Sequence, residues 1–260
     1  MLPDDLYAGS KWLNDNKLIV NVSKSNVMVI RSKNSTIESD MCVILDDKNI
    51  EQTSSVKLLG VTIEETLNWK VHVSQVSKNI SPKIGLSYRL SSFLSSSHLI
   101  QIYVATVQPI IDYAITLWGS CDKCVINLLQ RMQNRCARIC ANNFDYSVSS
   151  ATLIKQLKWM NISTRYSYFV CILMYKFVNG LLPINLDKHF RMVNQSHCYQ
   201  TRAYMTNIVS LPRPHTELFK RSLSFSGPSL RNALPLNTRN IPQFYTFKKQ
   251  LKAFLLSKQY

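Results

Sequence analysis

The period of the hydrophobic positions changes near residue 65. In segment 4–17, Leu6, Trp12 and Leu13 can share one face, which predicts a helix with acidic residues near its start. Short runs rich in β-branched residues follow, and they have the length of strands. These runs are 27–30, 41–45 and 56–63. The first 65 residues therefore predict one helix and three or four strands.

After residue 68 the apolar residues recur at spacings of three and four, which predicts helices. Pro82 is expected to kink or interrupt the first of them, and Pro109 to break the second. Four prolines between 185 and 235 argue against long regular elements there. The predicted helices are 69–80, 97–107, 125–140, 150–159, 163–179 and 244–256. The fold class is therefore α+β, a small antiparallel β region followed by a mainly α-helical part, with boundaries near 65 and between 141 and 149.

The distribution of charge separates the same two parts. The chain has 260 residues, 46% of them hydrophobic, and a formal net charge of +16, so it can bury a core and favours polyanionic partners. Residues 1–65 hold ten Asp or Glu and seven Lys or Arg, whereas the remaining residues hold five acids and 24 Lys or Arg. We therefore expect the part after Glu65 to bind the polyanion.

The cysteines and the most apolar segment bear on the compartment. Seven cysteines, an odd number, with no recognisable leader predict reduced thiols and an intracellular protein, nuclear or cytoplasmic. Segment 99–118 is long enough to span a bilayer, but its polar residues favour a core helix and predict no membrane partner. Cys121, Cys124, Cys136 and Cys140 leave two interpretations open, a zinc site or small hydrophobic residues on a helix.

Acidic pairs are the candidates for polymerase chemistry, which needs carboxylates from separate strands around two metal ions about 3.5–4 Å apart. Asp4-Asp5 fits a helix start, Asp46-Asp47 fits a turn between two strands, and Glu64-Glu65 follows a strand. No third carboxylate precedes Asp46-Asp47 on a strand, so the sequence predicts no catalytic residue and no metal ligand. The histidines show no ligand spacing, and no glycine-rich phosphate loop occurs.

Several segments in a fixed order carry a family resemblance. They are WLNDNKLIVNVSKSNVMVI, VKLLGVTIEETLNW, YVATVQPIIDYAITLWG, LLQRMQNRCARI, GLLPINL, LPRPHTELFKRSLSFSGPSLRNALP and FKKQLKAFLL. Together they resemble the region after the active site in reverse transcriptases of non-LTR retrotransposons, the jockey-like LINE group. In that family the aromatic-Ala-Asp-Asp motif lies tens of residues before the first segment. The resemblance thus implies that the catalytic pair, the fingers and the rest of the palm precede Met1.

The resemblance also implies a division of roles. Residues 1–65 would be the end of the palm, 66–145 a helical thumb, and 146–260 a C-terminal helical and mixed segment. Lys24 would lie near the nucleotide phosphates, or else be an exposed lysine in a turn. Segment 56–63 resembles the family's primer-grip hairpin, in which Leu59 and Gly60 would let the backbone approach the primer end, or else form a bulge.

The thumb is the predicted grip on template and primer. Arg131, Arg135 and Arg138 span ~10 Å of one helix face, about three nucleotide rises, so they can meet consecutive phosphates, or else form a solvated face. Lys78, Lys83 and Arg89 could extend this track. Such contacts carry no sequence information.

These expectations define the predicted function. The chain would be a truncated RNA-directed DNA polymerase, inactive alone, that keeps non-specific affinity for an RNA template, a DNA primer or their hybrid. It would hold no cofactor itself, since Mg²⁺ belongs to the intact enzyme. The alternative is a reused nucleic-acid-binding or scaffolding protein. Arg231 stands where relatives usually carry Trp, which makes the packing of that segment doubtful and suggests a decayed copy.

Overall fold

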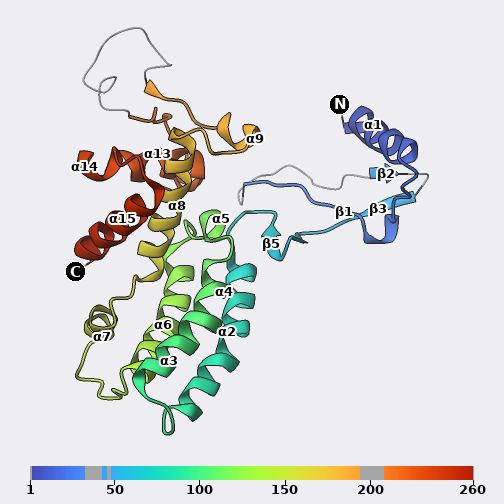
Figure 1. Ribbon diagram of the computed structural model, residues 1–260. Coiled ribbons are helices and arrows are strands. Elements are labelled where there is room, and N and C mark those ends of the chain that lie inside the picture. Colours follow the sequence, from blue (N-terminus) through green and yellow to red (C-terminus); the bar gives the residue numbers. More distant parts are fainter. Residues whose placement is uncertain (1, 33–42, 46–47, 194–207, 260) are drawn as a thin grey trace. The chain divides into compact units, whose positions relative to one another are not determined.

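The chain divides into two compact units, Met1–His72 and Val73–Tyr260. Figure 1 shows the computed structural model, which describes residues 2–32, 43–45, 48–193 and 208–259. The described residues form two small β-sheets near the N-terminus and helices through most of the rest. This confirms the predicted α+β class, whereas the three-part division at 65 and 145 stays a prediction.

The first unit begins with the helix α1 (Leu2–Asp15), close to the range predicted from the hydrophobic pattern. The helix ends where Lys17 takes a left-handed φ of 58° and donates its backbone N–H to the Asn14 carbonyl. Asp5 lies on this helix and is exposed to solvent. The short 3₁₀ turn η1 (Val22–Lys24) and the strand β1 (Asn26–Val27) follow.

A three-stranded sheet has the order β1-β3-β2. β2 (Val43–Leu45) and β3 (Lys48–Gln52) pair antiparallel, as predicted, and β1 adds a short parallel pairing to β3. The strand predicted at 27–30 is reduced to its first residue plus Asn26. Asp46-Asp47 and residues 41–42 lie outside the described part of the chain.

The run predicted at 56–63 is a hairpin, the form that the family resemblance implied, whereas its role as a primer grip stays a prediction. β4 (Ser55–Leu58) and β5 (Val61–Glu64) pair antiparallel around Leu59-Gly60. Both turn residues have positive φ, 47° and 82°, as a type I′ turn requires. The two residues therefore form a tight turn and not a bulge, and the apolar run on either side is shared between two paired strands.

α2 (Lys70–Leu90) continues through Pro82, so the interruption that was one of the two predicted outcomes does not occur. Proline in a helix interior lacks an N–H and crowds the preceding turn. On either side of Pro82, the hydroxyls of Ser81 and Ser87 donate hydrogen bonds to the backbone carbonyls of Ser77 and Lys83, one turn earlier in the helix. Val73, Val76, Ile80 and Ile84 form the buried stripe of the helix, so side-chain packing outweighs the lost hydrogen bond.

The helix predicted to stop at Pro109 continues to Asp112. α3 (Ser96–Ile102) passes into the π-turn η2 (Tyr103–Val107) and then α4 (Gln108–Asp112). The wide π-turn precedes Pro109 and accommodates the missing N–H. The real break lies at Ala114, whose φ is 51°, before α5 (Ile115–Trp118). No helix in the described ranges is long and apolar enough to cross a membrane.

The next three helices match their predicted ranges closely. They are α6 (Lys123–Cys140), α7 (Ser150–Gln156) and α8 (Ile162–Val178). Ser149 and Asn161 cap α7 and α8 by accepting backbone N–H groups from Thr152 and Thr164. Gly180, with φ of 65°, follows the end of α8.

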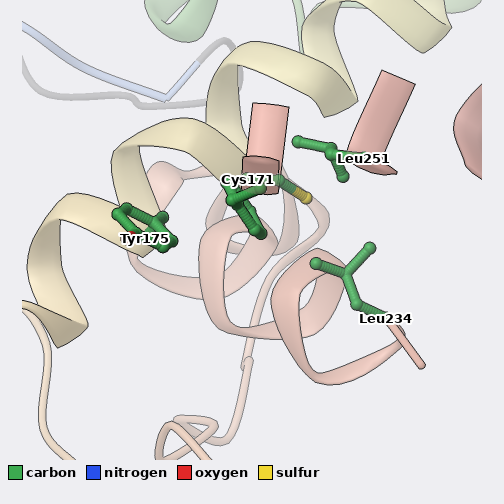
Figure 2. Packing of buried hydrophobic residues seen from close by; sticks show 5 residues of the cluster. Cys171, Tyr175, Leu234 and Leu251 are labelled. Carbon is green, nitrogen blue, oxygen red and sulfur yellow. The ribbon is translucent and has the colours of Figure 1, made fainter. Parts of the chain in front are cut away.

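The C-terminal elements are α9 (Ile184–Asp187), α12 (Glu217–Arg221), α13 (Leu223–Asn232), α14 (Leu236–Arg239) and α15 (Phe244–Gln259). Of these, α13 and α15 pack against α8, α12 packs against α13, and α14 packs against α15. Figure 2 shows Cys171 and Tyr175 of α8 against Leu234 and Leu251. Phe247 completes this cluster by stacking on Tyr175, with ring centroids 4.5 Å apart.

α13 contains Pro228 and packs against α8; at 10 residues it is short, in keeping with the prediction that the prolines of 185–235 exclude long regular elements. Gly227 permits the close approach, since a Cβ at this position would lie 2.7 Å from Met174 Sδ. Arg231 is buried, and that burial lowers the pKa of its guanidinium to about 10. The segment that carries this arginine in place of the family's tryptophan is therefore packed, which corrects the doubt raised by the sequence.

Candidate nucleic-acid interface

The two faces of α6 differ sharply in chemistry. Leu129, Met132 and Cys136 lie on the buried side, as the helical spacing predicted. Arg131 and Arg135 lie on the opposite side and are exposed. Among the described residues neither of these arginines has an ion-pair or hydrogen-bond partner, so both guanidinium groups are available to an anion.

Arg138 is placed differently from the other two arginines. Its guanidinium donates hydrogen bonds to the carbonyls of Asp145 and Val148, each at 2.9 Å. It also lies 4.8 Å from the centroid of the Tyr146 ring. Arg138 thus holds the loop that follows α6, and its predicted contact with phosphate stays a prediction.

A pocket of about 360 Å³ opens beside this arginine face. We call it the aromatic pocket and define it by Gly85 and Tyr88 of α2, Arg135 and Arg138 of α6, and Phe144 and Tyr146 of the following loop. Its volume lies within the range of about 300–1,000 Å³ that is usual for small-ligand sites.

Among the described residues, none of the acids after residue 65 forms an ion pair with Arg131 or Arg135 of α6. Asp112 pairs with Arg165, Asp122 with Arg221 at 2.7 Å, and Glu217 with Lys220. Asp145 accepts hydrogen bonds from the backbone N–H and the hydroxyl of Ser147, and these bonds lower the pKa of its carboxyl. The remaining acid, Asp187, lies at the end of α9. Arg131 and Arg135 therefore keep their charge unpaired among the described residues, whereas Asp145 interacts electrostatically with Arg138.

The three predicted residues of α2 do not share one face. Lys78 precedes Ser81 by three residues and Arg89 follows Gly85 by four, so both lie on the side of the helix that lines the aromatic pocket. Lys83 lies roughly 200° around the helix from Ser81. Helical geometry thus places Lys78 and Arg89 nearer than Lys83 to the pocket side of α2, and the predicted phosphate contacts of all three stay predictions.

Lys24, Leu59 and Gly60 belong to the first unit. Lys24 ends the turn η1 and is exposed, which fits the alternative of a turn lysine. Leu59 and Gly60 form the hairpin turn, and the Leu59 side chain is 84% exposed. Their predicted contacts with nucleotide and primer stay predictions.

Sequence reasoning missed Tyr88, Phe144 and Tyr146. Phe144 and Tyr146 follow the last arginine of α6 within eight residues, and aromatics close to arginines are a signal for nucleic-acid binding. Tyr88 lies far away in the sequence, on another helix. Only the packing of α2 beside α6, where the Ser77 hydroxyl contacts Met132 Sδ at 3.1 Å, brings it to the same pocket.

The four cysteines do not form a metal centre. Cys136 and Cys140 are buried on α6, while Cys124 is exposed. Burial raises the pKa of the Cys121, Cys136 and Cys140 thiols to about 12, which disfavours the thiolate that a metal needs. Within the described ranges no group of three or more His, Cys, Asp or Glu could hold a metal ion.

Comparison with known proteins adds a relative. The chain is 29% identical, over 161 residues, to the probable RNA-directed DNA polymerase from transposon X-element of Drosophila melanogaster. The chain is related to a transposon reverse transcriptase. This confirms the relationship predicted from the ordered segments, although the alignment covers 60% of the chain instead of nearly all of it. The aligned part is 17% of the polymerase's length. No protein-family model and no solved structure matches the chain.

Proposed function

We propose that this chain forms the thumb-like part of a non-LTR retrotransposon reverse transcriptase and binds template–primer duplex through its phosphate backbone. The observation that carries the proposal is the exposed arginine face of α6, where Arg131 and Arg135 lack an acidic partner among the described residues. The similarity to the transposon polymerase supports nucleic acid as the polyanion.

The spacing of the arginines suits one strand of a duplex. Arg131 and Arg135 are separated by one turn of α6, a rise of ~6 Å, which is about two nucleotide steps of ~3.4 Å. Lys78 and Arg89 lie on the neighbouring face of α2 and would continue the contact. Because phosphates are the same in every sequence, the binding is non-specific.

The test is a salt titration with a fluorescein-labelled blunt RNA–DNA hybrid, followed by anisotropy. The double variant Arg131→Gln/Arg135→Gln removes two phosphate contacts, so the slope of log K against log salt should become shallower by about 2. Hybrids of different sequence should lose affinity equally.

The matched control is Lys249→Gln/Lys252→Gln, which removes the same charge from exposed positions of α15. The control should keep the original salt slope. Equal losses in both variants would mean that net charge, and not the α6 face, drives binding, and would contradict the proposal.

We further propose that this chain does not catalyse nucleotidyl transfer on its own. Bound Mg²⁺ would accordingly require the rest of the polymerase. The sequence contains no aromatic-Ala-Asp-Asp motif, and Asp46-Asp47 lies outside the described residues. Primer extension with Mg²⁺ should give no product. A product that disappears in Asp46→Asn would overturn this part.

A further inference from the structure

The aromatic pocket presents open ring surface beside the arginine face. Phe144 meets Tyr88 edge-on, with centroids 5.8 Å apart and planes at 89°. Tyr88 is 59% exposed and Tyr146 is 85% exposed. A duplex held by its phosphates would leave these rings unused, because its bases are paired and stacked on each other.

The loop that carries Tyr146 is held in place. Arg138 donates to two carbonyls of the loop and covers one face of the Tyr146 ring. Asp145 turns the backbone by accepting the Ser147 N–H at 2.8 Å. The Tyr146 ring is 85% exposed, and the hydrogen bonds of Arg138 tie the loop backbone to α6, which reduces the entropy lost on binding.

The charge at the pocket indicates what the ligand carries. Arg135 lines the pocket and is exposed, and Asp145, the acid of this loop, is bonded to Ser147. A ligand with a flat aromatic ring and an adjacent negative charge matches both features. A nucleotide combines these two groups within one unit, and any base offers a face for stacking.

We propose that the aromatic pocket takes one unpaired base of a nucleic-acid strand, stacked on Tyr146 and framed by Tyr88 and Phe144, with the adjoining phosphate on Arg135. The inference rests on the proposed function and extends it from the duplex backbone to single-stranded template next to the duplex. Since stacking does not distinguish the four bases strongly, the pocket would hold the strand without selecting its sequence.

The experiment compares three labelled hybrids by anisotropy: blunt, with a short single-stranded extension, and with the same extension made abasic. The extension should tighten binding by about 5- to 100-fold through stacking, and the abasic extension should lose most of this gain. A 2-aminopurine placed in the extension should lose fluorescence on binding.

Two variants assign the gain to the pocket. Tyr146→Ala should abolish it, whereas Tyr146→Phe should keep it, because stacking needs the ring and not the hydroxyl. The matched control is Tyr245→Ala on α15, which removes a tyrosine that is 74% exposed and lies outside the pocket. These surface positions leave the core intact.

The outcomes separate the two proposals. A gain that persists with the abasic extension, or in Tyr146→Ala, would overturn the stacked base and leave the phosphate track standing. Equal affinity for blunt and extended hybrids would do the same. If blunt-hybrid binding were unchanged in Arg131→Gln/Arg135→Gln, the proposed function itself would fail.

Discussion

Each of the two units is stabilised internally by a different kind of interaction. In the described part of Met1–His72, the buried apolar side chains are Val43, Ile50 and Val61, while Trp12 and Ile19 are 61% and 96% exposed. The second unit buries a continuous set of large side chains along its helices. Local hydrogen bonds and turns therefore define the first unit, whereas side-chain packing defines the second.

The charges follow the same division. Acids outnumber Lys and Arg in residues 1–65, whereas later acids are few and three of them pair with an arginine or lysine of their own unit. The second unit therefore combines the well-packed core with the cationic surface. Mutations in its core should thus affect binding through stability, and mutations on the α6 face should affect binding alone.

The largest effect is expected at the partly buried ion pair of the second unit. Asp112→Ala would leave Arg165, which is 8% exposed and donates its Nε–H to Asp112 at 2.6 Å, without its carboxylate. An uncompensated buried charge costs about 3–5 kcal/mol, so the free energy of unfolding should fall by that amount in urea denaturation followed by circular dichroism. The exposed pair offers the control, because Glu217→Ala should change nothing measurable.

The next largest change in stability is expected where α13 packs against α8. Gly227→Ala would place a methyl against the buried Met174 and should destabilise the second unit by about 1–3 kcal/mol. Gly85→Ala on α2 meets no atom within 4 Å and should stabilise it by about 0.5–1 kcal/mol through helix propensity. Opposite shifts in melting temperature are expected. Equal shifts would show that α13 and α8 adjust freely.

In the first unit, the substitution expected to change stability most lies in the turn of the β4–β5 hairpin. Leu59 holds a left-handed φ of 47°, which is unfavourable for leucine, and Asn-Gly is the preferred pair in a type I′ turn. Leu59→Asn should stabilise the β4–β5 hairpin by about 1 kcal/mol, measured as slower hydrogen exchange of β5 amides. Amides of α8 serve as the internal control. Faster exchange in β5 would contradict the turn assignment.

The smallest effect is a pH dependence of the first unit. His72 is 3% exposed, its Nδ1 accepts the Thr62 N–H at 3.3 Å, and burial lowers its pKa below 6.5. The unfolded chain therefore binds more protons below pH 6.5, so this contribution is full above pH 6.5 and is lost as the pH falls toward the lowered pKa. The protection factor of the Thr62 amide against hydrogen exchange should fall as the pH drops over that range. The exposed His98→Gln should leave the effect in place, and His72→Gln should remove it.

The sequence correctly predicted those helices that are specified by the spacing of their own apolar residues. α6 and α8 appear where the spacing of apolar residues placed them, because this signal depends only on neighbouring turns of the same helix. Pro82 and Pro109 do not interrupt their helices, for the complementary reason. Their local cost is offset by buried stripes and by a π-turn, which depend on neighbouring helices.

At the candidate site, too, the sequence predicts the direction of a side chain from its own helix but not its contacts with other segments. The arginine face of α6 follows from spacing alone, since a helix that buries Leu129 and Met132 must turn Arg131 and Arg135 outward. The different position of Arg138 depends on carbonyls of residues 145 and 148, which no periodicity reveals. Tyr88 joins Phe144 only when two helices pack side by side.

By itself, then, the sequence determined the α+β class, the charge asymmetry, the amphipathic helices and the relationship to transposon reverse transcriptases. Tertiary structure alone decided that Arg231 is buried, and that Tyr88 shares one pocket with Phe144, Tyr146 and two arginines. Periodicity fixes which way a side chain points from its own helix or strand, but its neighbours across the core are fixed only when long-range packing closes the chain.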